Sequence, residues 1–255
     1  MNDARTGEPI DWDAAAYQNL SVPQQAWAEE VLDRLALAGD EVVLDLGCGA
    51  GQVTEKLVRL VPRGRVIGVD ASESMIHAAR ARLGATAELI RADLRTFSYS
   101  GQSDVVFSTA TLHWVPDHRN LWTRIRRALK RGGRLEAQYG GAGNISTVVA
   151  ALPQIARRDP FAEFLTPYAT PWTFDAPDTA ESDLHASGFR DVRTWSETRT
   201  ARPSDPLAFL ANSIVPTERA RLPPDLQAEF VDAVFAAIDR PDHYDYVRLN
   251  VSATA

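Results

Sequence analysis

Residues 42–51 read VVLDLGCGAG, a short apolar run that leads directly into a turn with three glycines. An unbroken run of this kind is typical of a strand that is buried on both faces. Glycines at alternate positions let the backbone pass close to a ligand in conformations that a side chain forbids. The third glycine comes one residue earlier than in the G-x-G-x-x-G turns that bind a pyrophosphate. The stretch therefore predicts a nucleotide-type cofactor pocket for which a diphosphate is the weaker fit, with the negative charge of Asp45 beside it.

Two later apolar runs each end in an aspartate. Residues 65–70 read RVIGVD and place Asp70 about twenty residues beyond the glycine turn, where a parallel sheet presents an acceptor for a ribose diol. Residues 88–93 read ELIRAD, and we expect Asp93 to accept a hydrogen bond from the exocyclic amino group of an adenine. Apolar strands alternate with helical stretches along this half of the chain, which favours a parallel sheet covered on both faces.

These residues resemble the class I S-adenosylmethionine (SAM)-dependent methyltransferases, whose first motif is an acidic residue followed by G-x-G-x-G. The resemblance continues in order through Asp70, Ala92-Asp93, residues 104–114 (DVVFSTATLHW) and residues 129–135 (LKRGGRL). It implies an α/β fold with a doubly wound, seven-stranded, mostly parallel sheet and a helical cap or lid made by insertions. It also implies SAM as the methyl donor and S-adenosylhomocysteine as the product. The residues expected to contact the cofactor are Asp45, Gly47, Cys48, Gly49, Gly51, Asp70, Ala71, Ala92, Asp93, Leu94, Thr109 and Trp114.

Two side chains at the end of the expected fourth strand are candidates for chemistry or for packing. His113 could orient an acceptor or take its proton, because ligands bind at the carboxyl ends of strands in open parallel sheets. The alternative is a neutral histidine that is hydrogen-bonded beside the cofactor. Trp114 could form a wall against the adenine or methionine portion of SAM, or simply pack. Cys48 is better explained as a small side chain beneath the cofactor than as a nucleophile.

Residues 11–17 (DWDAAAY) and 112–118 (LHWVPDH) are similar to the trans-aconitate methyltransferase branch, which esterifies small carboxylic acids. A carboxylate is already ionised at pH 7, so it needs a clamp and no general base, whereas an alcohol or amine benefits from proton removal. Arg199 and Arg202 are candidates for such a clamp. Aromatic residues expected to contact the acceptor are Trp12, Tyr17, Tyr139, Tyr168 and Trp172, although Tyr168 and Trp172 also fit the core of a lid.

Three other functions stay open at this stage. The acceptor atom could be a hydroxyl or an amine of a natural product. The chain could bind SAM as a sensor without turnover, because methyl transfer has no obligatory catalytic side chain. A nucleotide-dependent oxidoreductase is disfavoured by the glycine spacing and by the absence of a Tyr-x-x-x-Lys pair.

Composition narrows the partners and the compartment. The net charge of -7 over 255 residues argues against nucleic acid, which needs a concentrated basic face. A single cysteine and five histidines without close ligand spacing predict no metal site and no intramolecular disulfide. With no signal peptide or long apolar stretch in view, we expect a cytoplasmic protein with a small-molecule acceptor and no membrane partner. The oligomeric state stays open.

The pattern along the chain predicts one compact enzyme in four segments. These are an N-terminal lid segment (1–30), a SAM-binding core (31–140), a lid insertion (141–178) and a C-terminal part of the sheet (179–255) with a helical cap at about 203–241. Helices are expected at 23–36, 52–60, 72–83, 179–187, 207–214 and 225–238. Strands after the lid insertion are expected at 189–200, on the sheet edge, and at 244–252, where polar and apolar residues alternate.

Overall fold

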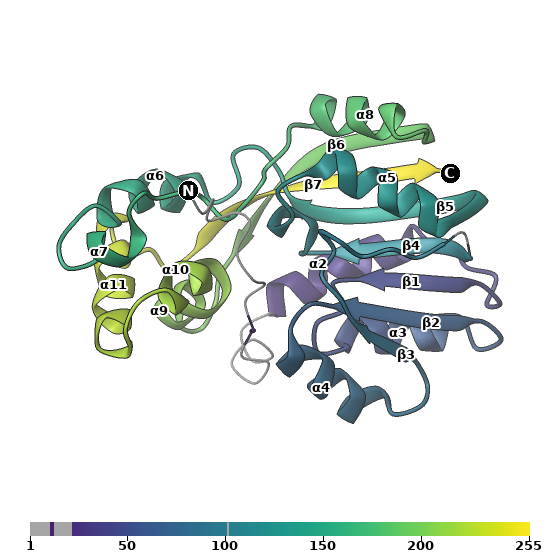
Figure 1. The fold of residues 1–255 in the computed structure, drawn as a ribbon, viewed down its shortest axis with the longest axis horizontal. Helices are drawn as coiled ribbons and strands as arrows, with labels where there is room; N and C mark the ends of the chain where they lie inside the picture. The colour runs from purple at the N-terminus through teal and green to yellow at the C-terminus, as the bar shows by residue number, and fades with distance from the viewer. Residues whose placement is uncertain (1–10, 13–21, 101) are drawn as a thin grey trace.

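The computed structural model describes residues 11–12, 22–100 and 102–255, and it contains a seven-stranded sheet in the order β3-β2-β1-β4-β5-β7-β6 (Figure 1). The strands are β1 (Val42–Leu46), β2 (Arg65–Asp70), β3 (Glu88–Arg91), β4 (Ser103–Thr109), β5 (Leu129–Gly140), β6 (Arg190–Ala201) and β7 (Tyr244–Thr254). Strands β1 to β5 form parallel pairs, and β7 runs antiparallel to both β5 and β6. The predicted mostly parallel sheet is confirmed, and the last strand of the chain lies inside the sheet rather than at its edge.

Helices cover both faces of this sheet. One layer consists of α2 (Val22–Asp33), α3 (Gln52–Leu60) and α4 (Glu73–Leu83), and the other consists of α5 (His118–Ala128) and α8 (Pro177–Ala186). Successive side chains of β1 pack against opposite helical layers. Val43 belongs to the core that contains Val31 of α2, whereas Leu44 belongs to the core that contains Trp122 of α5. This two-sided burial explains why β1 reads as a continuous apolar run.

The glycine turn between β1 and α3 depends on the conformations that glycine permits. Gly47, Gly49 and Gly51 have φ angles of 80°, 52° and 83°, all in the left-handed region. A Cβ on Gly47 would lie 2.0 Å from Oγ1 of Thr111, so the turn also requires a missing side chain where it passes the end of β4. The backbone NH groups of Gly47 and Cys48 both donate to the carbonyl of Val69, which fixes the turn against β2.

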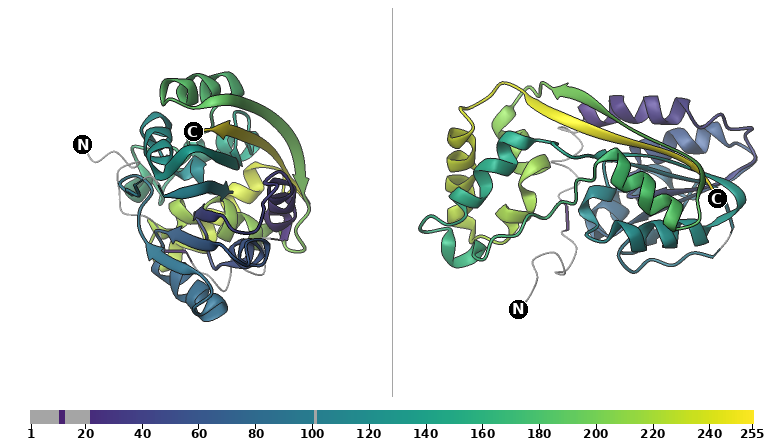
Figure 2. Two further views of the ribbon diagram at one scale, coloured as in Figure 1. Left: turned by 90° about the vertical axis from the view of Figure 1, so that its right-hand side faces the viewer. Right: turned by 90° about the horizontal axis from the view of Figure 1, so that it is seen from above.

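A helical cap lies beyond the carboxyl ends of the parallel strands (Figures 1 and 2). It is built from α6 (Ser146–Ile155), α7 (Ala162–Leu165), α9 (Pro206–Phe209), the π-helical turn η2 (Leu210–Ile214), α10 (Pro216–Ala220) and α11 (Pro224–Ala237). Two separate insertions contribute to it, and they share one apolar core in which the rings of Phe161 and Phe230 lie 5.3 Å apart. Ala201 of β6 and Tyr244 of β7 extend into the same core and connect the cap to the sheet.

The expected helices agree with the structure except at their ends. The helix at 52–60 is confirmed, and Ser72 caps α4 by accepting a hydrogen bond from the backbone NH of Met75 at 3.2 Å. The helix expected at 23–36 ends at Asp33 and is followed by a turn at residues 34–35, and Ala36, with a φ of 44°, cannot belong to an α-helix. The stretch at 207–214 is divided between α9 and the π-helical turn η2. Within the described residues, none of the helices has the length and apolar character that crossing a membrane requires.

Candidate functional site

The glycine turn and the ends of β2 and β4 converge on one edge of the sheet. Asp70, the last residue of β2, accepts hydrogen bonds from the backbone NH groups of Gly49 and Ser72, both at 2.9 Å. Burial raises the pKa of this carboxyl group. A Cβ built on Gly49 would meet no described atom closer than the sulfur of Met75, 4.0 Å away, so the described residues leave this side of the turn uncrowded. A hydrogen-bonding carboxylate beside an open glycine backbone fits the ribose of SAM.

Asp45 supports the turn from below. It is 2 % exposed, and its Oδ2 accepts a hydrogen bond from Oγ1 of Thr54 in α3 at 2.7 Å. Burial raises the pKa of Asp45 to about 7; the Thr54 bond opposes this shift and the charge of Asp70 adds to it. The neighbouring Cys48 packs on β2, because a Cβ on Gly68 would lie 3.0 Å from its sulfur. Burial raises the pKa of the Cys48 thiol well above its ordinary value, which favours the packing interpretation over a nucleophile.

The residues expected at the third and fourth strand ends lie at the same edge of the sheet. Ala92 donates its backbone NH to the carbonyl of Asp70 at 2.9 Å, and the side chain of Leu94 is buried in the core. The carboxylate of Asp93 accepts the backbone NH of Arg95 and also forms an ion pair with its guanidinium at 2.6 Å. A carboxylate offers about four lone-pair positions, so Asp93 retains capacity for an adenine amino group, and this contact stays a prediction. Ala71 is half-buried, and Thr109 ends β4.

His113 lies in the single helical turn η1 (Leu112–Trp114) that follows β4, and it is held by its ring and its backbone. Its Nδ1 accepts the backbone NH of Gly140 at 3.4 Å, so the proton of the neutral ring is on Nε2. Its carbonyl accepts the backbone NH of Thr173 at 2.8 Å. Burial, followed by the positive charges of Arg248 and His118, lowers the pKa of His113 well below its ordinary value. His113 is therefore a neutral hydrogen-bond donor and a weak base.

His118, which the sequence did not single out for a role, anchors the turn η1 to the segment between α7 and α8. Its Nε2 donates to the carbonyl of Leu112 at 2.9 Å, and its Nδ1 bonds to the carboxylate of Asp175. Asp175 follows the segment that returns from the cap, so one buried ring joins the end of β4 to that segment. The only available signal in the sequence was its position in the 112–118 motif.

The described residues of the N-terminal segment lie against the glycine turn. Oδ1 of Asp11 accepts hydrogen bonds from Oγ of Ser72 at 2.6 Å and from the backbone NH of Ser74 at 3.0 Å, and these bonds lower the pKa of Asp11. Trp12 packs with Ala50 and Met75. These contacts bring residues 11–12 to the N-terminus of α4, beside Asp70.

Aromatic rings continue from Trp12 towards the cap. The rings of Trp12 and Trp114 meet edge to face at 5.3 Å, those of Trp114 and Trp172 lie 5.8 Å apart, and Trp172 stacks on Phe174 at 5.7 Å. Phe174 in turn lies 5.9 Å from the ring of His113. Trp172 is buried with the cap core, and this arrangement fits the packing interpretation for it. These rings form an aromatic wall that runs from Trp12 past the end of β4 to the cap core.

Two of the expected acceptor contacts lie in packed surroundings. Tyr139 is fully buried against His118 and Trp122 on the α5 side of the sheet, which favours a packing role, and its contact with the acceptor stays a prediction. The reason is the alternation of β5, which turns this ring into the core. Tyr168 donates its hydroxyl to Oε1 of the buried Glu218 within the cap, at 2.9 Å. Tyr17 lies outside the described residues.

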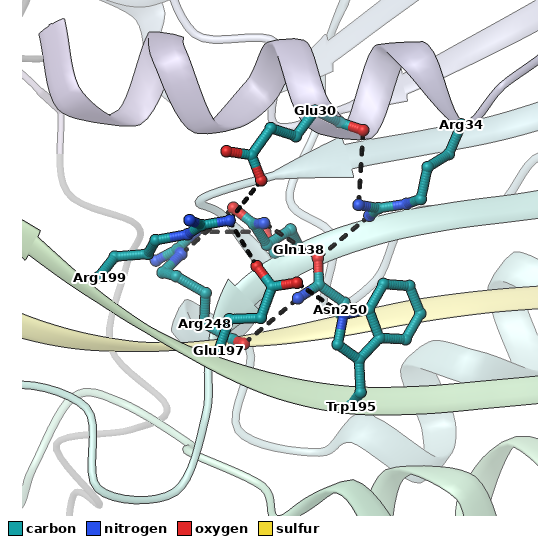
Figure 3. A network of polar contacts seen from close by, with 8 residues as sticks. All are labelled: Glu30, Arg34, Gln138, Trp195, Glu197, Arg199, Arg248 and Asn250. Atoms are coloured by element: carbon teal, nitrogen blue, oxygen red, sulfur yellow. Dashed lines mark hydrogen bonds and ion pairs between the residues drawn. The ribbon is translucent and has the colours of Figure 1, made fainter.

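The two arginines proposed as an anion clamp are occupied by ion pairs. Arg199 pairs with Glu30 of α2 and, at 2.7 Å, with Glu197, whereas Arg202 pairs with Asp242 at the surface. Arg199 belongs to a polar network between α2 and strands β5, β7 and β6, which also contains Arg248, a residue that sequence reasoning missed (Figure 3). The alternation of polar and apolar residues in β7 was the signal that could have found it.

Comparison with known proteins agrees with this architecture. Residues 43–133 match the family described as a methyltransferase domain. An uncharacterized methyltransferase of Schizosaccharomyces pombe is 33% identical over 209 residues, which cover 73% of this chain and 79% of that protein. A trans-aconitate 2-methyltransferase of Variovorax paradoxus is 31% identical over 236 residues, covering 91% and 90%.

Solved structures support the fold alone. The phosphoethanolamine N-methyltransferase 2 of Haemonchus contortus, in complex with SAM, has a TM-score of 0.62 at 18% identity, covering 99% of this chain and 60% of that chain. The YcgJ protein of Bacillus subtilis has a TM-score of 0.60 at 13% identity, covering 90% and 97%.

The fold and these relatives thus define a methyltransferase, and the chain belongs to the class I SAM-dependent methyltransferases. Its cofactor is SAM. Within the class, the chain is similar to the trans-aconitate 2-methyltransferases over nine-tenths of its length.

Proposed function

We propose that this enzyme transfers the methyl group of SAM to a carboxylate oxygen of a small organic acid. The products would be a methyl ester and S-adenosylhomocysteine. The observation that carries the proposal is the state of His113, which lies at the end of β4 as a neutral donor with Nδ1 occupied by Gly140. The names of the trans-aconitate relatives support the same acceptor class.

The division of labour follows from the site. SAM supplies a methyl group on a positively charged sulfur, which leaves as a neutral thioether. Asp70 and the backbone of the glycine turn would hold its adenosine portion. Trp12 and Trp114 would exclude water from the reacting atoms, and Nε2–H of His113 would orient the acceptor oxygen by a hydrogen bond. No step requires a residue of this chain to remove a proton.

An acceptor that must lose a proton fits this site less well. Burial among the charges of Arg248 and His118 makes the His113 ring a poor base. A carboxylic acid is ionised at neutral pH and already carries its nucleophilic lone pairs. We therefore favour a carboxylate over the hydroxyl or amine of a natural product, and both remain outcomes of the test.

The test is turnover by the purified full chain with labelled SAM and a panel of acids, each paired with its amide and its alcohol. Mass spectrometry should detect methyl esters from the acids. Because neither the acceptor nor His113 titrates near neutrality, kcat/KM for the acid, measured with SAM saturating, should stay within about twofold between pH 6.5 and 8.5. Methylation of the alcohols or amines alone, with a rate that rises with pH, would replace the proposal by base-assisted transfer. SAM binding in calorimetry with no product from any acceptor would favour the sensor interpretation.

A further inference from the structure

The stretch of chain that leads into α8 lies between the end of β5 and the turn η1, which carries His113. Thr173 donates its backbone NH to the carbonyl of His113 at 2.8 Å, and its hydroxyl donates to the carbonyl of Pro116 at 3.3 Å. Two residues later, the carbonyl of Asp175 accepts the backbone NH of Ala142, just beyond β5, at 2.8 Å. The stretch is therefore hydrogen-bonded to both elements.

Phe174, between these two residues, packs on His113 itself. The two rings lie 5.9 Å apart, with 35° between their planes. A Cβ on Gly140 would lie 2.6 Å from Cε1 of Phe174, so this ring also packs on the glycine whose backbone NH binds Nδ1 of His113. The position of residues 173–175 thus limits the space in which the His113 ring can turn.

A buried pair of side chains, His118 and Asp175, fixes this stretch relative to η1. Nε2 of His118 lies 2.9 Å from the carbonyl of Leu112, and a carbonyl only accepts hydrogen bonds, so Nε2 carries a hydrogen. Nδ1 of the same ring bonds to Oδ2 of Asp175, and this contact requires one proton between the two atoms. Whether that proton belongs to the ring or to the carboxyl group, the pair has no net charge. Its side chains are 3 % and 12 % exposed, so water competes little for either bond.

The turn η1 depends on these external contacts. It has only three residues, and its hydrogen bonds run from the NH of Trp114 to Thr111 at 3.0 Å and from the NH of Val115 to Leu112 at 2.9 Å. Such short 3₁₀ turns have poorer hydrogen-bond geometry than an α-helix. Methyl transfer needs the acceptor oxygen, the methyl carbon and the sulfur in line, and a misplacement of about 1 Å can lower a rate by about 100-fold. A residue that orients the acceptor from η1 therefore needs support from outside the turn.

We propose that His118 and Asp175 are positioning residues for methyl transfer. Acting through Leu112 and residues 173–175, they hold the ring of His113 in the orientation and the Nε2–H tautomer that bind the acceptor. This inference rests on the proposed function for the role of His113. It goes beyond that function because it assigns a part in the reaction to two residues that act only through their neighbours.

The experiment compares the wild type with Asp175→Ala, Asp175→Asn and the matched control Asp183→Ala. Asparagine keeps the hydrogen bond, because its Nδ2–H can donate to Nδ1 of a neutral His118. Asp183 is a carboxylate of α8 that pairs with Arg119 of α5 at 2.9 Å, so its removal breaks a tie to the residue next to His118 without changing the contacts of η1. His118→Asn adds a second test from the other side, since the shorter amide can still reach Asp175 but not the carbonyl of Leu112.

The first measurement requires no turnover. Nitrogen-15 NMR of protein labelled in its histidine rings reports the tautomer of His113 in the complex with S-adenosylhomocysteine, and the signal is assigned by its loss in His113→Gln. The second measurement is kcat and KM at neutral pH for the acid that the wild type methylates best. Calorimetry with S-adenosylhomocysteine and unfolding in urea show that each variant is folded and binds the cofactor product.

His113 should be a single Nε2–H tautomer in the wild type and in Asp183→Ala, and should exchange between tautomers in Asp175→Ala and His118→Asn. These two variants should lose at least about 30-fold in kcat, with a smaller change in KM, because a misaligned acceptor binds but reacts slowly. Asp175→Asn should recover to within about fivefold of the wild-type kcat, and Asp183→Ala should stay within about threefold. Affinity for S-adenosylhomocysteine should be the same in all variants.

Three results would overturn the inference. One is a His113 spectrum that is the same in Asp175→Ala as in the wild type. Another is an equal loss of kcat in Asp175→Ala and Asp183→Ala, and the third is a kcat for Asp175→Asn no higher than that of Asp175→Ala. If Asp175→Ala does not fold, His118→Asn takes its place in each comparison. If the spectra change as expected but the wild type forms no ester from any acid, the proposed function fails while the positioning of His113 stands.

Discussion

The buried carboxyl group of Asp45 should make the stability of this protein depend on pH. Asp45→Asn should remove the part of this pH dependence that Asp45 causes. The pKa of Asp45 rises from 3.8 to about 7 in the folded protein. Between these two pKa values the folded protein keeps the proton on Asp45, whereas the unfolded chain releases it. The contribution of protonated Asp45 to stability is therefore complete below pH 4 and is lost as the pH rises through about 7. Between pH 5 and pH 8 the loss covers about two pH units of titration, which corresponds to about 3 kcal/mol.

The asparagine variant isolates this effect. Its amide oxygen would still accept the hydrogen bond from Thr54, and the cost of burying its NH2 group, about 1–3 kcal/mol, is the same at both pH values. The buried Glu218, whose pKa is raised to about 7 without any contribution from Asp45, titrates in both proteins and cancels in the comparison. The free energy of unfolding in urea, followed by tryptophan fluorescence and circular dichroism at pH 5 and pH 8, gives the two differences.

The wild type should lose about 3 kcal/mol more stability than the variant when the pH is raised from 5 to 8. If both proteins lose the same amount, Asp45 is ionised at the same pH in the folded and unfolded states, and the argument from burial is wrong. A variant that is less stable at both pH values by a constant amount would report only the buried amide.

Three further predictions concern the turn and its neighbours. Gly47→Ala should lower the free energy of unfolding by at least about 2 kcal/mol, and by more than Gly132→Ala does. Both glycines have a positive φ, but only at Gly47 would the new Cβ meet a side chain, that of Thr111 at 2.0 Å. Equal losses of stability in chemical denaturation would reject the steric argument. Trp12→Ala should speed release of S-adenosylhomocysteine by about tenfold in stopped-flow fluorescence, since this ring contributes to the wall over the site, and an unchanged rate would remove it from that role. Cys48 should resist iodoacetamide at pH 7.5 until urea unfolds the chain, as read by mass spectrometry, and rapid native labelling would show that the thiol is neither buried nor raised in pKa.

The glycine turn and the strand and helix on either side of it could be predicted because their signals are local. A continuous apolar run followed by glycines at 47, 49 and 51 specifies a buried strand and a turn with positive φ, whatever the rest of the chain does. The same locality explains the confirmed helix α3 and the capped start of α4. Asp70 lies beside the turn because parallel strands place their carboxyl ends at one edge.

The acceptor side of the site is decided by contacts between distant segments. Whether a residue of β5 or β7 points to the core, to α2 or to the cap depends on register, and one residue of shift reverses every side chain. The register between β5 and β7 places Arg248 opposite Gly140, and the side chain of the neighbouring Tyr139 points into the core. These pairings span more than a hundred positions in the chain, so no local pattern encodes them.

By itself the sequence determined strand β1, the glycine turn and helix α3, since the signals for these elements act over a few residues. Only the tertiary structure decided that two insertions share one cap core and that His118 and Asp175 join the end of β4 to the segment before α8. It also decided that Arg248 lies opposite Gly140, whose backbone NH binds His113. The physical reason is that β7 enters the sheet between β5 and β6. This late strand brings its buried polar side chains against elements formed much earlier in the chain.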